Sequence, residues 1–380
     1  MTKYIGIDIG ASFVKGALFD LERGTISNIT KYVSPTNQII HKFKNPRFEV
    51  DGNLYLKQVK KILNLLLKSK HGVAGIVLSS QMHGCIVIDN DKKPMTPFIG
   101  WQDERALDIG LHGDSYLDVM NKILPKKFIN KTGVMLRPGL MSVSLFWLKQ
   151  QGFFKKNINK DVKSLFLGDF IALSLTKGDC AVESTQACGS GLFDVQKKVW
   201  HQGILNLLGL DQRILPTIVP TGTPIGYLSF QKSRVPIYVS VGDLQVAVLG
   251  SLVSASATSD LSINIGTGSQ VSVVCDRFSI GNHDLRSFFD DKLLKTVAFL
   301  PAGRALNVIV QFVERLLFQT TKNKKSIDVW EFITNAISKK DNANNIQCSI
   351  SFFKNNATTS SVGSILGITE GNLTIENIFF

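Results

Sequence analysis

The chain has 380 residues, of which 44% are hydrophobic and 19% are charged, and its formal net charge at pH 7 is +13. At roughly 100–200 residues per domain, this length predicts two globular domains, and the composition argues against a disordered chain. The basic residues are scattered, with one short run at 322–325, so we expect a lysine-rich surface and no nucleic-acid partner.

Cysteine spacing and hydropathy predict a cytoplasmic protein that does not enter a membrane. The five cysteines form no C-x-x-C pair, which disfavours structural zinc and a disulfide framework. The uncharged stretch 214–231 is interrupted by prolines, and 244–259 is shorter than the ~20 apolar residues of a membrane span. No secretory signal is visible, because Asp8 interrupts the apolar run at 4–9.

The order of apolar patterns along the chain predicts alternating strands and helices, which is typical of an α/β fold. Strands are expected at 4–9, 13–19, 73–79, 85–89 and 236–241. Helices are expected at 54–68 and 140–150, as a buried helix at 244–259, and as the start of a helix at 375–380. The segment 216–226 is rich in Pro, Gly and Thr and is expected to be a loop.

An internal repeat relates two distant parts of the chain. Residues 4–20 and 260–276 each show an apolar strand, a turn of small residues, a second apolar strand and a closing Asp. The alignment matches Asp8 with Asn264, Ile9 with Ile265, Gly10 with Gly266, Ser12 with Gly268 and Asp20 with Asp276. One copy per domain predicts two related domains that each open with the same hairpin.

The first hairpin has residues suited to phosphate. Gly10 leads into a second strand and not a helix, which disfavours a dinucleotide-binding fingerprint, and no G-x-x-x-x-G-K-[ST] motif is present. Backbone N–H groups of a glycine turn can point at phosphate oxygens, and Asp8 can hold Mg²⁺ through water. The alternative is an ordinary hairpin, but the recurrence of the turn at 264–268 favours phosphate binding.

Five motifs, in order along the chain, resemble those of the FGGY carbohydrate kinases. They are G-I-D-I-G-A-S at 6–12, S-Q-M-H-G at 80–84, W-Q-D-E-R at 101–105, G-D-L-Q-V-A at 242–247 and G-T-G at 266–268. They are most similar to the motifs of sedoheptulokinases, and Q-M-H-G resembles xylulokinase-type members. The resemblance implies two actin/hexokinase-like (ribonuclease H-like) domains around a cleft. Residues 1–252 would form the N-terminal sugar-binding and catalytic domain, and 253–380 the C-terminal nucleotide-binding domain.

The resemblance also implies roles for individual residues. Asp243 would be the general base that takes the proton of the attacking sugar hydroxyl, while a helix cap is the alternative and is compatible with it. The implied sugar-binding residues are Gln81, Met82, His83, Asp103 and Arg105. The implied ATP phosphate-binding residues are Gly10, Ala11, Ser12, Lys15, Gly266, Thr267 and Gly268, and the implied Mg²⁺ ligand is Asp8. The alternatives are a hydrogen-bonded loop histidine at 83 and a surface ion-pair stretch at 101–105.

The implied activity is phosphorylation of a ketose by ATP and Mg²⁺, with sedoheptulose as the first candidate and xylulose, another ketose or a polyol as alternatives. Sedoheptulose 7-phosphate would place the chain in the pentose phosphate pathway. The family's later adenosine-binding segment has no counterpart here, so we expect an incomplete second domain and weakened ATP binding. A non-catalytic sugar-binding protein is therefore a second hypothesis. An actin-like polymerising protein is a third, which the motifs at 80–84 and 101–105 disfavour.

Overall fold

A computed structural model describes residues 2–35, 43–68, 72–110, 113–157, 161–231, 233–252, 261–266, 269–320, 328–337, 346–352 and 362–379. Its internal contacts divide the chain into two compact units. The first unit comprises 1–260, 274–280 and 284–295, and the second comprises 261–273, 281–283 and 296–380. The domain boundary expected between residues 252 and 253 remains a prediction.

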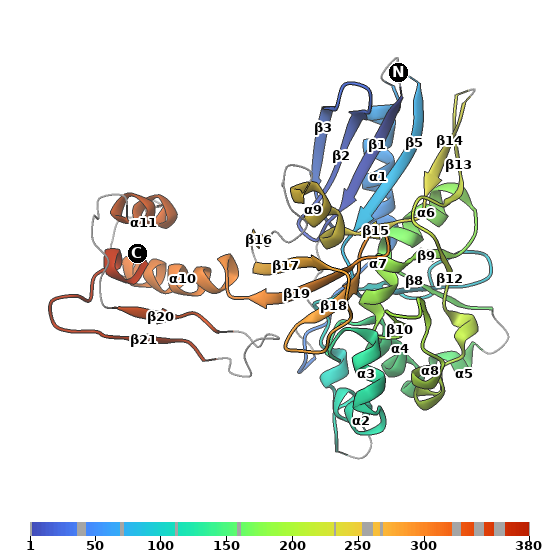
Figure 1. Cartoon of the computed structure of the whole chain (residues 1–380). Coiled ribbons are helices and arrows are strands. Elements are labelled where there is room, and N and C mark those ends of the chain that lie inside the picture. The colour runs from blue at the N-terminus through green and yellow to red at the C-terminus, as the bar shows by residue number, and fades with distance from the viewer. Residues whose placement is uncertain are drawn as a thin grey trace. The chain divides into compact units, whose positions relative to one another are not determined.

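The first unit is built on a seven-stranded sheet, which Figure 1 shows with its strands side by side. The order is β13–β14–β5–β1–β2–β3, and β15 also pairs with β5. The bounds are β1 Lys3–Ile9, β2 Phe13–Asp20, β3 Thr25–Val33, β5 Val73–Ser80, β13 Pro224–Phe230, β14 Ser233–Tyr238 and β15 Val241–Gly242. Strands β1 and β15 both run parallel to β5. Their carboxyl ends therefore meet at one edge, which is where open α/β sheets bind ligands.

Helix α1 (Gly52–Leu67) covers one face of this sheet and confirms the helix predicted at 54–68. It begins at Asp51, whose side chain accepts the Asn53 N–H, and its buried residues recur at helical spacing. The contact with β2 is close, because a Cβ added at Gly16 would lie 2.3 Å from Ile62 Cγ2. Helix α6 (Leu167–Thr176) lies against β5, β13 and β14.

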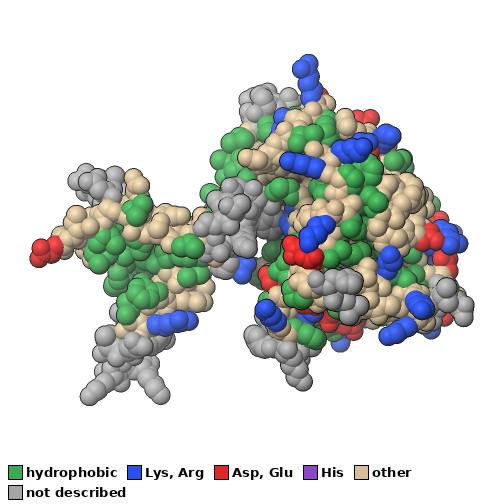
Figure 2. Space-filling view, turned by 90° about the horizontal axis from the view of Figure 1, so that it is seen from below, with side chains coloured by type: hydrophobic (Ala, Val, Ile, Leu, Met, Phe, Trp, Pro, Cys, Tyr) green, Lys and Arg blue, Asp and Glu red, His purple; other side chains and the backbone are tan. Residues whose placement is uncertain are grey.

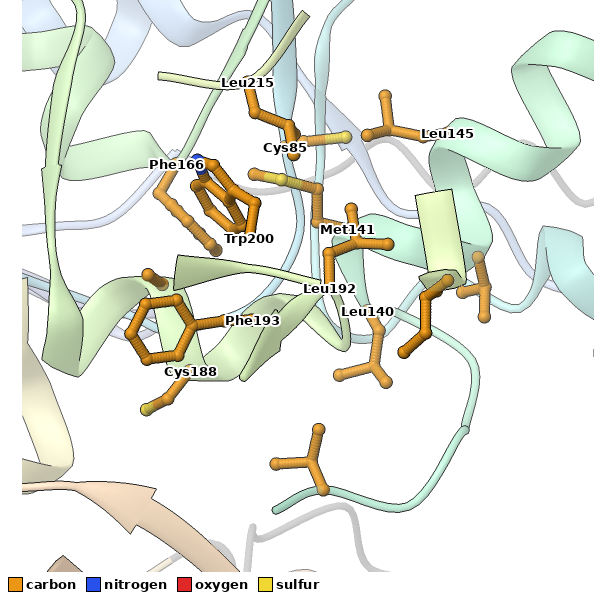
Figure 3. Close-up of a cluster of buried hydrophobic side chains, with 14 of the residues drawn as sticks. Cys85, Leu140, Met141, Leu145, Phe166, Cys188, Leu192, Phe193, Trp200 and Leu215 are labelled. Atoms are coloured by element: carbon orange, nitrogen blue, oxygen red, sulfur yellow. The ribbon is translucent and has the colours of Figure 1, made fainter. Parts of the chain in front are cut away.

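One hydrophobic core lies between the main sheet and helices α1 and α6. Another holds together the elements that follow β5 (Figure 3). The rings of Phe193 and Trp200 meet edge to face, with centroids 6.0 Å apart, and the Trp200 indole N–H donates to the Pro216 carbonyl at 2.9 Å. Met82 and Cys85 also belong to this core, so the core fixes the loop that follows β5.

The remaining elements of the first unit are short. They are β4 Glu49–Val50, β6 Ile86–Ile88, β7 Phe98–Ile99, a 3₁₀ turn at Arg105–Leu107, α2 Tyr116–Ile123, α3 Lys126–Thr132, α4 Met141–Gln150, α5 Phe153–Lys156, β8 Lys163–Leu165, β9 Ala181–Glu183, α7 Ser184–Ala187, a 3₁₀ turn at Cys188–Ser190, β10 Phe193–Asp194, β11 Val199–Trp200, α8 Gln202–Leu208, a 3₁₀ turn at Gln212–Ile214, β12 Thr217–Val219, α9 Asp243–Leu252 and β18 Asp284–Ser287. The predicted strands at 73–79 and 85–89 and the predicted helix at 140–150 are therefore confirmed, within a few residues at their ends.

Three predicted elements differ from the structure. The segment 216–226 is not all loop, because β12 pairs in parallel with β9 and β13 begins at Pro224 on the edge of the main sheet. An edge strand tolerates proline there, since the missing N–H would face solvent. The strand expected at 236–241 is divided between β14 and β15. The buried helix expected at 244–259 is α9, of which only Leu244, Gln245 and Val248 are buried, and 253–260 lie outside the described residues.

The second unit contains the other predicted hairpin. Its elements are β16 Ser262–Ile265, most of β17 Ser269–Cys275 and of β19 Leu293–Leu300, α10 Gly303–Thr320, α11 Val329–Ile337, β20 Gln347–Ser349, β21 Ser364–Leu366 and α12 Ile375–Phe379. Both hairpins of the repeat are present, but Ile9 faces Val14 whereas Ile265 faces Ser269. The second turn is therefore one residue shorter than the first. A small apolar cluster centred on Val310 and Ile333 holds α10 and α11 together.

The surface agrees with the expected distribution of charge. Figure 2 shows Lys and Arg side chains spread over the visible face of the first unit, with Asp and Glu side chains between them. Within the ranges that the structure describes, no helix combines the length and apolar character needed to cross a membrane.

Candidate active site

Two carboxylates lie at the edge where β1, β5 and β15 end. Asp8 on β1 stands opposite Ser79 of β5, whose hydroxyl donates to Asp8 Oδ1 at 3.2 Å. Asp243 is the first residue of α9 and follows β15, whose Gly242 stands opposite Ser80 of β5. The structure therefore brings the predicted metal ligand and the predicted base to neighbouring positions.

The environment of Asp243 suits a group that accepts a proton. Burial raises the pKa of Asp243 to about 6, and the negative charge of Asp8 adds to this rise. The Leu244 N–H, which donates to Asp243 Oδ1 at 2.8 Å, and the charge of Arg286 both act to lower the same pKa. A carboxylate with a pKa near the working pH is suited to general base catalysis.

The turn before Asp243 is held by buried polar side chains. The Gly242 N–H donates to the Thr185 hydroxyl at 2.9 Å, and that hydroxyl donates to the Glu183 carboxylate. The Gln186 amide donates to the carbonyl that precedes Gly242, at 3.0 Å. A Cβ at Gly242 would lie 2.4 Å from Gln245 Oε1 and 3.1 Å from the Thr185 carbonyl oxygen. A side chain at this position would have to displace the Gln245 amide, which favours a glycine before the Asp.

The turn of the first hairpin is tightly folded. The Gly10 N–H donates to the Phe13 carbonyl at 3.0 Å, and the Ser34 hydroxyl donates to the Gly10 carbonyl at 2.7 Å. Ala11 and Ser12 at the tip are exposed. The Gly10 N–H is therefore used within the turn, so the backbone groups of the tip are the ones suited to a phosphate.

The other predicted phosphate-binding residues are divided between the two units. Lys15 is opposite Asp8 in the hairpin, with its Nζ 3.6 Å from Asp8 Oδ2. Gly266 directly follows β16, and its carbonyl accepts the Gly303 N–H at 3.0 Å. Thr267 and Gly268 lie outside the described residues.

The predicted sugar loop turns sharply after β5. His83 and Gly84 have φ values of +66° and +69°, in the left-handed region. A Cβ at Gly84 would lie 2.3 Å from the Ile99 carbonyl oxygen, so the close approach of that backbone requires glycine. Gln81 is buried, and its amide donates to the Tyr55 hydroxyl at 3.3 Å. This orientation joins Gln81 to α1.

Both ring nitrogens of His83 are bonded within the chain. Nδ1 lies 2.6 Å from the Gly189 carbonyl oxygen and Nε2 lies 3.2 Å from Arg137 Nη2. A carbonyl only accepts and a guanidinium only donates, so Nδ1 carries the hydrogen and Nε2 accepts. Burial, with the charges of Arg137 and Arg286, holds the pKa of His83 well below its usual range. The neutral ring of His83 positions Arg137. The sugar-binding role of His83 remains a prediction.

A buried charge cluster continues from His83. Arg137 Nη1 lies 3.2 Å from Asp284 Oδ2, and Arg286 Nη2 donates to the same oxygen at 3.0 Å. Burial opposes the charge on Asp284, but the two arginines outweigh it and hold the pKa of Asp284 below its usual value. Arg286 Nη1 lies 3.5 Å from Met82 Sδ. No motif in the sequence indicates these contacts, because Arg137, Asp284 and Arg286 stand in segments without a recognisable pattern.

Asp103 and Arg105 form a separate buried pair. The Asp103 carboxylate accepts the Phe48 N–H at 2.8 Å, the Arg105 N–H at 2.9 Å and Arg105 Nε–H at 2.7 Å. Arg105 also donates to Glu49 Oε1 at 2.5 Å, and its guanidinium lies 5.0 Å from the centroid of the Trp147 ring. Both side chains are buried, so this is not a surface ion-pair stretch. The pair holds the segment against β4, and its sugar-binding role remains a prediction.

The position of Asp8 suits a magnesium ion that is also held by phosphates and water. Among the described residues, no group of three or more His, Cys, Asp or Glu side chains is placed to hold a metal. Mg²⁺ commonly binds through one or two carboxylates together with waters and substrate phosphates. Asp8, with a side chain that is 38% exposed at a strand end, meets that requirement.

Residues 3–250 match the sequence model of the FGGY family of carbohydrate kinases, N-terminal domain. The chain belongs to this family. A xylulose kinase of Lactococcus lactis subsp. lactis is 26% identical over 261 residues, which are 66% of this chain and 49% of the relative. A glycerol kinase of Coxiella burnetii is 24% identical over 256 residues, 65% of this chain and 49% of the relative. This FGGY-family chain thus spans about half the length of the curated relatives it matches.

Solved structures of several kinases share the fold. Xylulose kinase and gluconate kinase from Lactobacillus acidophilus superimpose with TM-scores of 0.80 and 0.81, at 21% identity, and each match covers 100% of this chain and 75% or 74% of the other. Plasmodium falciparum glycerol kinase with ADP gives a TM-score of 0.78 at 18% identity, covering 100% of this chain and 75% of that one. The predicted α/β fold with actin/hexokinase-like domains is confirmed.

Proposed function

We propose that this chain transfers the γ-phosphoryl group of ATP to a terminal hydroxyl of a ketose, with Asp243 as general base. The observation that carries the proposal is that Asp8 and Asp243 lie close together at the sheet edge, where the pKa of Asp243 is raised to about 6. Family membership supports a carbohydrate acceptor. Sedoheptulose is our first candidate because the W-Q-D of the motif at 101–105 resembles that of sedoheptulokinases. The alternatives are xylulose, since Q-M-H-G at 81–84 resembles xylulokinase-type members, another ketose or a polyol.

In the proposed reaction, Asp243 takes the proton of the acceptor hydroxyl. The hydroxyl oxygen bonds to the γ-phosphorus while the bond from that phosphorus to the β–γ bridging oxygen breaks, and ADP leaves. The hairpin tip at 10–12 and Lys15 would hold phosphate oxygens. Bound Mg²⁺, which Asp8 would hold through water, supplies neutralisation of phosphate charge.

We also propose that the reaction takes place in the cytoplasm, as a step of the pentose phosphate pathway. All five cysteines are free thiols, which supports a reducing compartment. The pathway assignment follows from the proposed product, sedoheptulose 7-phosphate, and would be wrong if the substrate were another sugar.

Release of ADP on adding a sugar to the full chain with Mg-ATP tests the proposal. We expect turnover with sedoheptulose and much less with xylulose, glycerol or gluconate, and we expect none after Mg²⁺ is removed with a chelator. Turnover with xylulose alone would reject sedoheptulose as the substrate. Sugar binding by calorimetry without ADP release from any sugar would instead support the non-catalytic hypothesis.

The fall of kcat/KM at acidic pH should follow the protonation of Asp243. A general base must be ionised, so kcat/KM should fall by about tenfold per pH unit below roughly pH 6 and level off above it. Initial rates at low sugar concentration between pH 4.5 and 8.5 measure this limb. Because the charge of Asp8 raises the pKa of Asp243, the residual activity of Asp8→Asn should show the limb at lower pH. An acid limb at the same pH in both proteins would contradict the assignment.

A further inference from the structure

The backbone just before Asp243 is bonded to two adjacent side chains of α7. The peptide unit that joins Val241 to Gly242 uses both of its polar groups in this way. Its N–H donates to the Thr185 hydroxyl at 2.9 Å, and its carbonyl accepts the Gln186 amide at 3.0 Å. Buried backbone groups are nearly always paired, most often with other backbone. Here the short strand β15 pairs with β5, and side chains of α7 hold its last peptide unit.

Thr185 contacts the turn on both sides of the proposed base. In addition to the bond from Gly242, its main-chain carbonyl accepts the amide of Gln245 on α9 at 3.3 Å. One residue of α7 therefore holds the backbone before Asp243 and a side chain in the helical turn after it. The side chain of Thr185 is fully buried, so it does not touch a substrate. Its effect on the reaction would have to pass through the position of Asp243.

The Thr185 hydroxyl is held in one orientation by Glu183. A hydroxyl both donates and accepts, whereas an ionised carboxylate only accepts. The Thr185 hydroxyl donates to Glu183 Oε2, which leaves the lone pairs of its oxygen for the Gly242 N–H. The same carboxylate accepts the Thr185 N–H at 2.7 Å and the hydroxyls of Ser184 at 2.7 Å and Thr221 at 2.8 Å. Four converging donors fix the carboxylate, and the carboxylate fixes the threonine hydroxyl.

We propose that Thr185 is a positioning residue, whose hydroxyl holds the Gly242 N–H and thereby fixes Asp243 beside Asp8. The inference rests on the proposed kinase function and deepens it. A general base must lie within hydrogen-bond distance of the proton that it takes, and a displacement of about 1 Å can cost roughly a hundredfold in rate. Because Thr185 does not reach the sugar, its loss should appear in kcat and not in sugar affinity.

Three substitutions at position 185 separate the hydroxyl from the rest of the side chain. Thr185→Val keeps the branched shape and removes the hydroxyl, Thr185→Ala removes the hydroxyl without adding a methyl group, and Thr185→Ser keeps the hydroxyl. With sedoheptulose, or with xylulose if wild type phosphorylates only that sugar, kcat for ADP release should fall roughly tenfold to a hundredfold in the first two. Thr185→Ser should restore most of the rate. Sugar affinity, measured by calorimetry without ATP, should stay close to that of wild type in all three.

A double-mutant cycle distinguishes positioning of the base from general support of the fold. In an Asp243→Asn background there is no base to position, so Thr185→Val should change the residual kcat by less than about twofold. A residue that only supports the fold would lower kcat by the same factor in both backgrounds. Equal factors would therefore overturn the proposal.

The matched control is Thr96→Val. The Thr96 hydroxyl also accepts a backbone N–H, that of Val87 at 3.0 Å, but it serves strand β6. Its loss should lower the thermal midpoint and leave kcat unchanged. A kcat like that of wild type in folded Thr185→Val or Thr185→Ala would also overturn the positioning role. Absence of turnover by wild type with every sugar would reject the proposed function itself, and the positioning role with it.

Discussion

Replacing Asp243 with Asn should lower kcat by roughly 10²–10⁴-fold, the usual contribution of a positioned general base. Asparagine keeps the size of the side chain and can still accept the Leu244 N–H through its carbonyl oxygen, but it cannot take a proton from the acceptor hydroxyl. The loss should appear in kcat, while sugar affinity measured without ATP should change little. Single-turnover assays with Mg-ATP and sedoheptulose measure the chemical step directly.

A matched control for this substitution is Asp169→Asn. Asp169 on α6 is also a buried carboxyl, and burial, helped by the charge of Glu183, raises its pKa well above the usual value. Burial therefore favours the neutral form of Asp169, which an amide resembles, so the substitution should be tolerated with activity within a few-fold of wild type. Equal losses in the two variants would point to disturbed packing and would remove the case for Asp243 as base.

Replacing Asp103 with Ala should lower the free energy of unfolding by about 3–5 kcal/mol, because it leaves a buried guanidinium short of its main partner. Arg105 is 4% exposed at its side chain, and Glu49 is its only other anionic partner among the described residues. The Phe48 N–H would also lose its acceptor. Urea unfolding followed by tryptophan fluorescence measures the change, since Trp147 lies against Arg105.

The surface pair Asp91–Lys93 provides the comparison for this prediction. Its atoms lie 3.8 Å apart and both side chains are well exposed, so Asp91→Ala should change stability by less than about 1 kcal/mol. A result in which Asp103→Ala unfolds like wild type but binds sugar at least tenfold more weakly would favour the direct sugar contact implied by the W-Q-D-E-R motif.

Local patterns were enough to predict the parts of the fold that depend on neighbouring residues. The two hairpins, the strand at 73–79 and the helix at 54–68 each follow from periodicity or turn chemistry within about 20 residues. Strand β12 was missed because its partner β9 lies far away in the sequence, and the prolines and glycines that flank β12 resemble those of a loop.

Within the candidate site, too, residues in local motifs could be predicted, whereas contacts between distant parts of the sequence could not. Asp8, Met82 and Asp243 stand within motifs, and the structure places them near one another. Arg286 stands in a motif-free segment, and its relation to Met82 depends on packing between residues 204 positions apart. The burial of Asp103 could not be predicted from the sequence either, because an Asp two residues before an Arg also occurs in ion pairs on the surface.

Strand β5 is a shared support for the proposed chemistry, since Asp8 and Gly242 are both paired with its last residues and the sugar loop continues from it. Arg286 lies on β18, an element that β5 does not pair with. By contrast, a substitution that displaces the last residues of β5 should shift both carboxylates and the predicted sugar loop together.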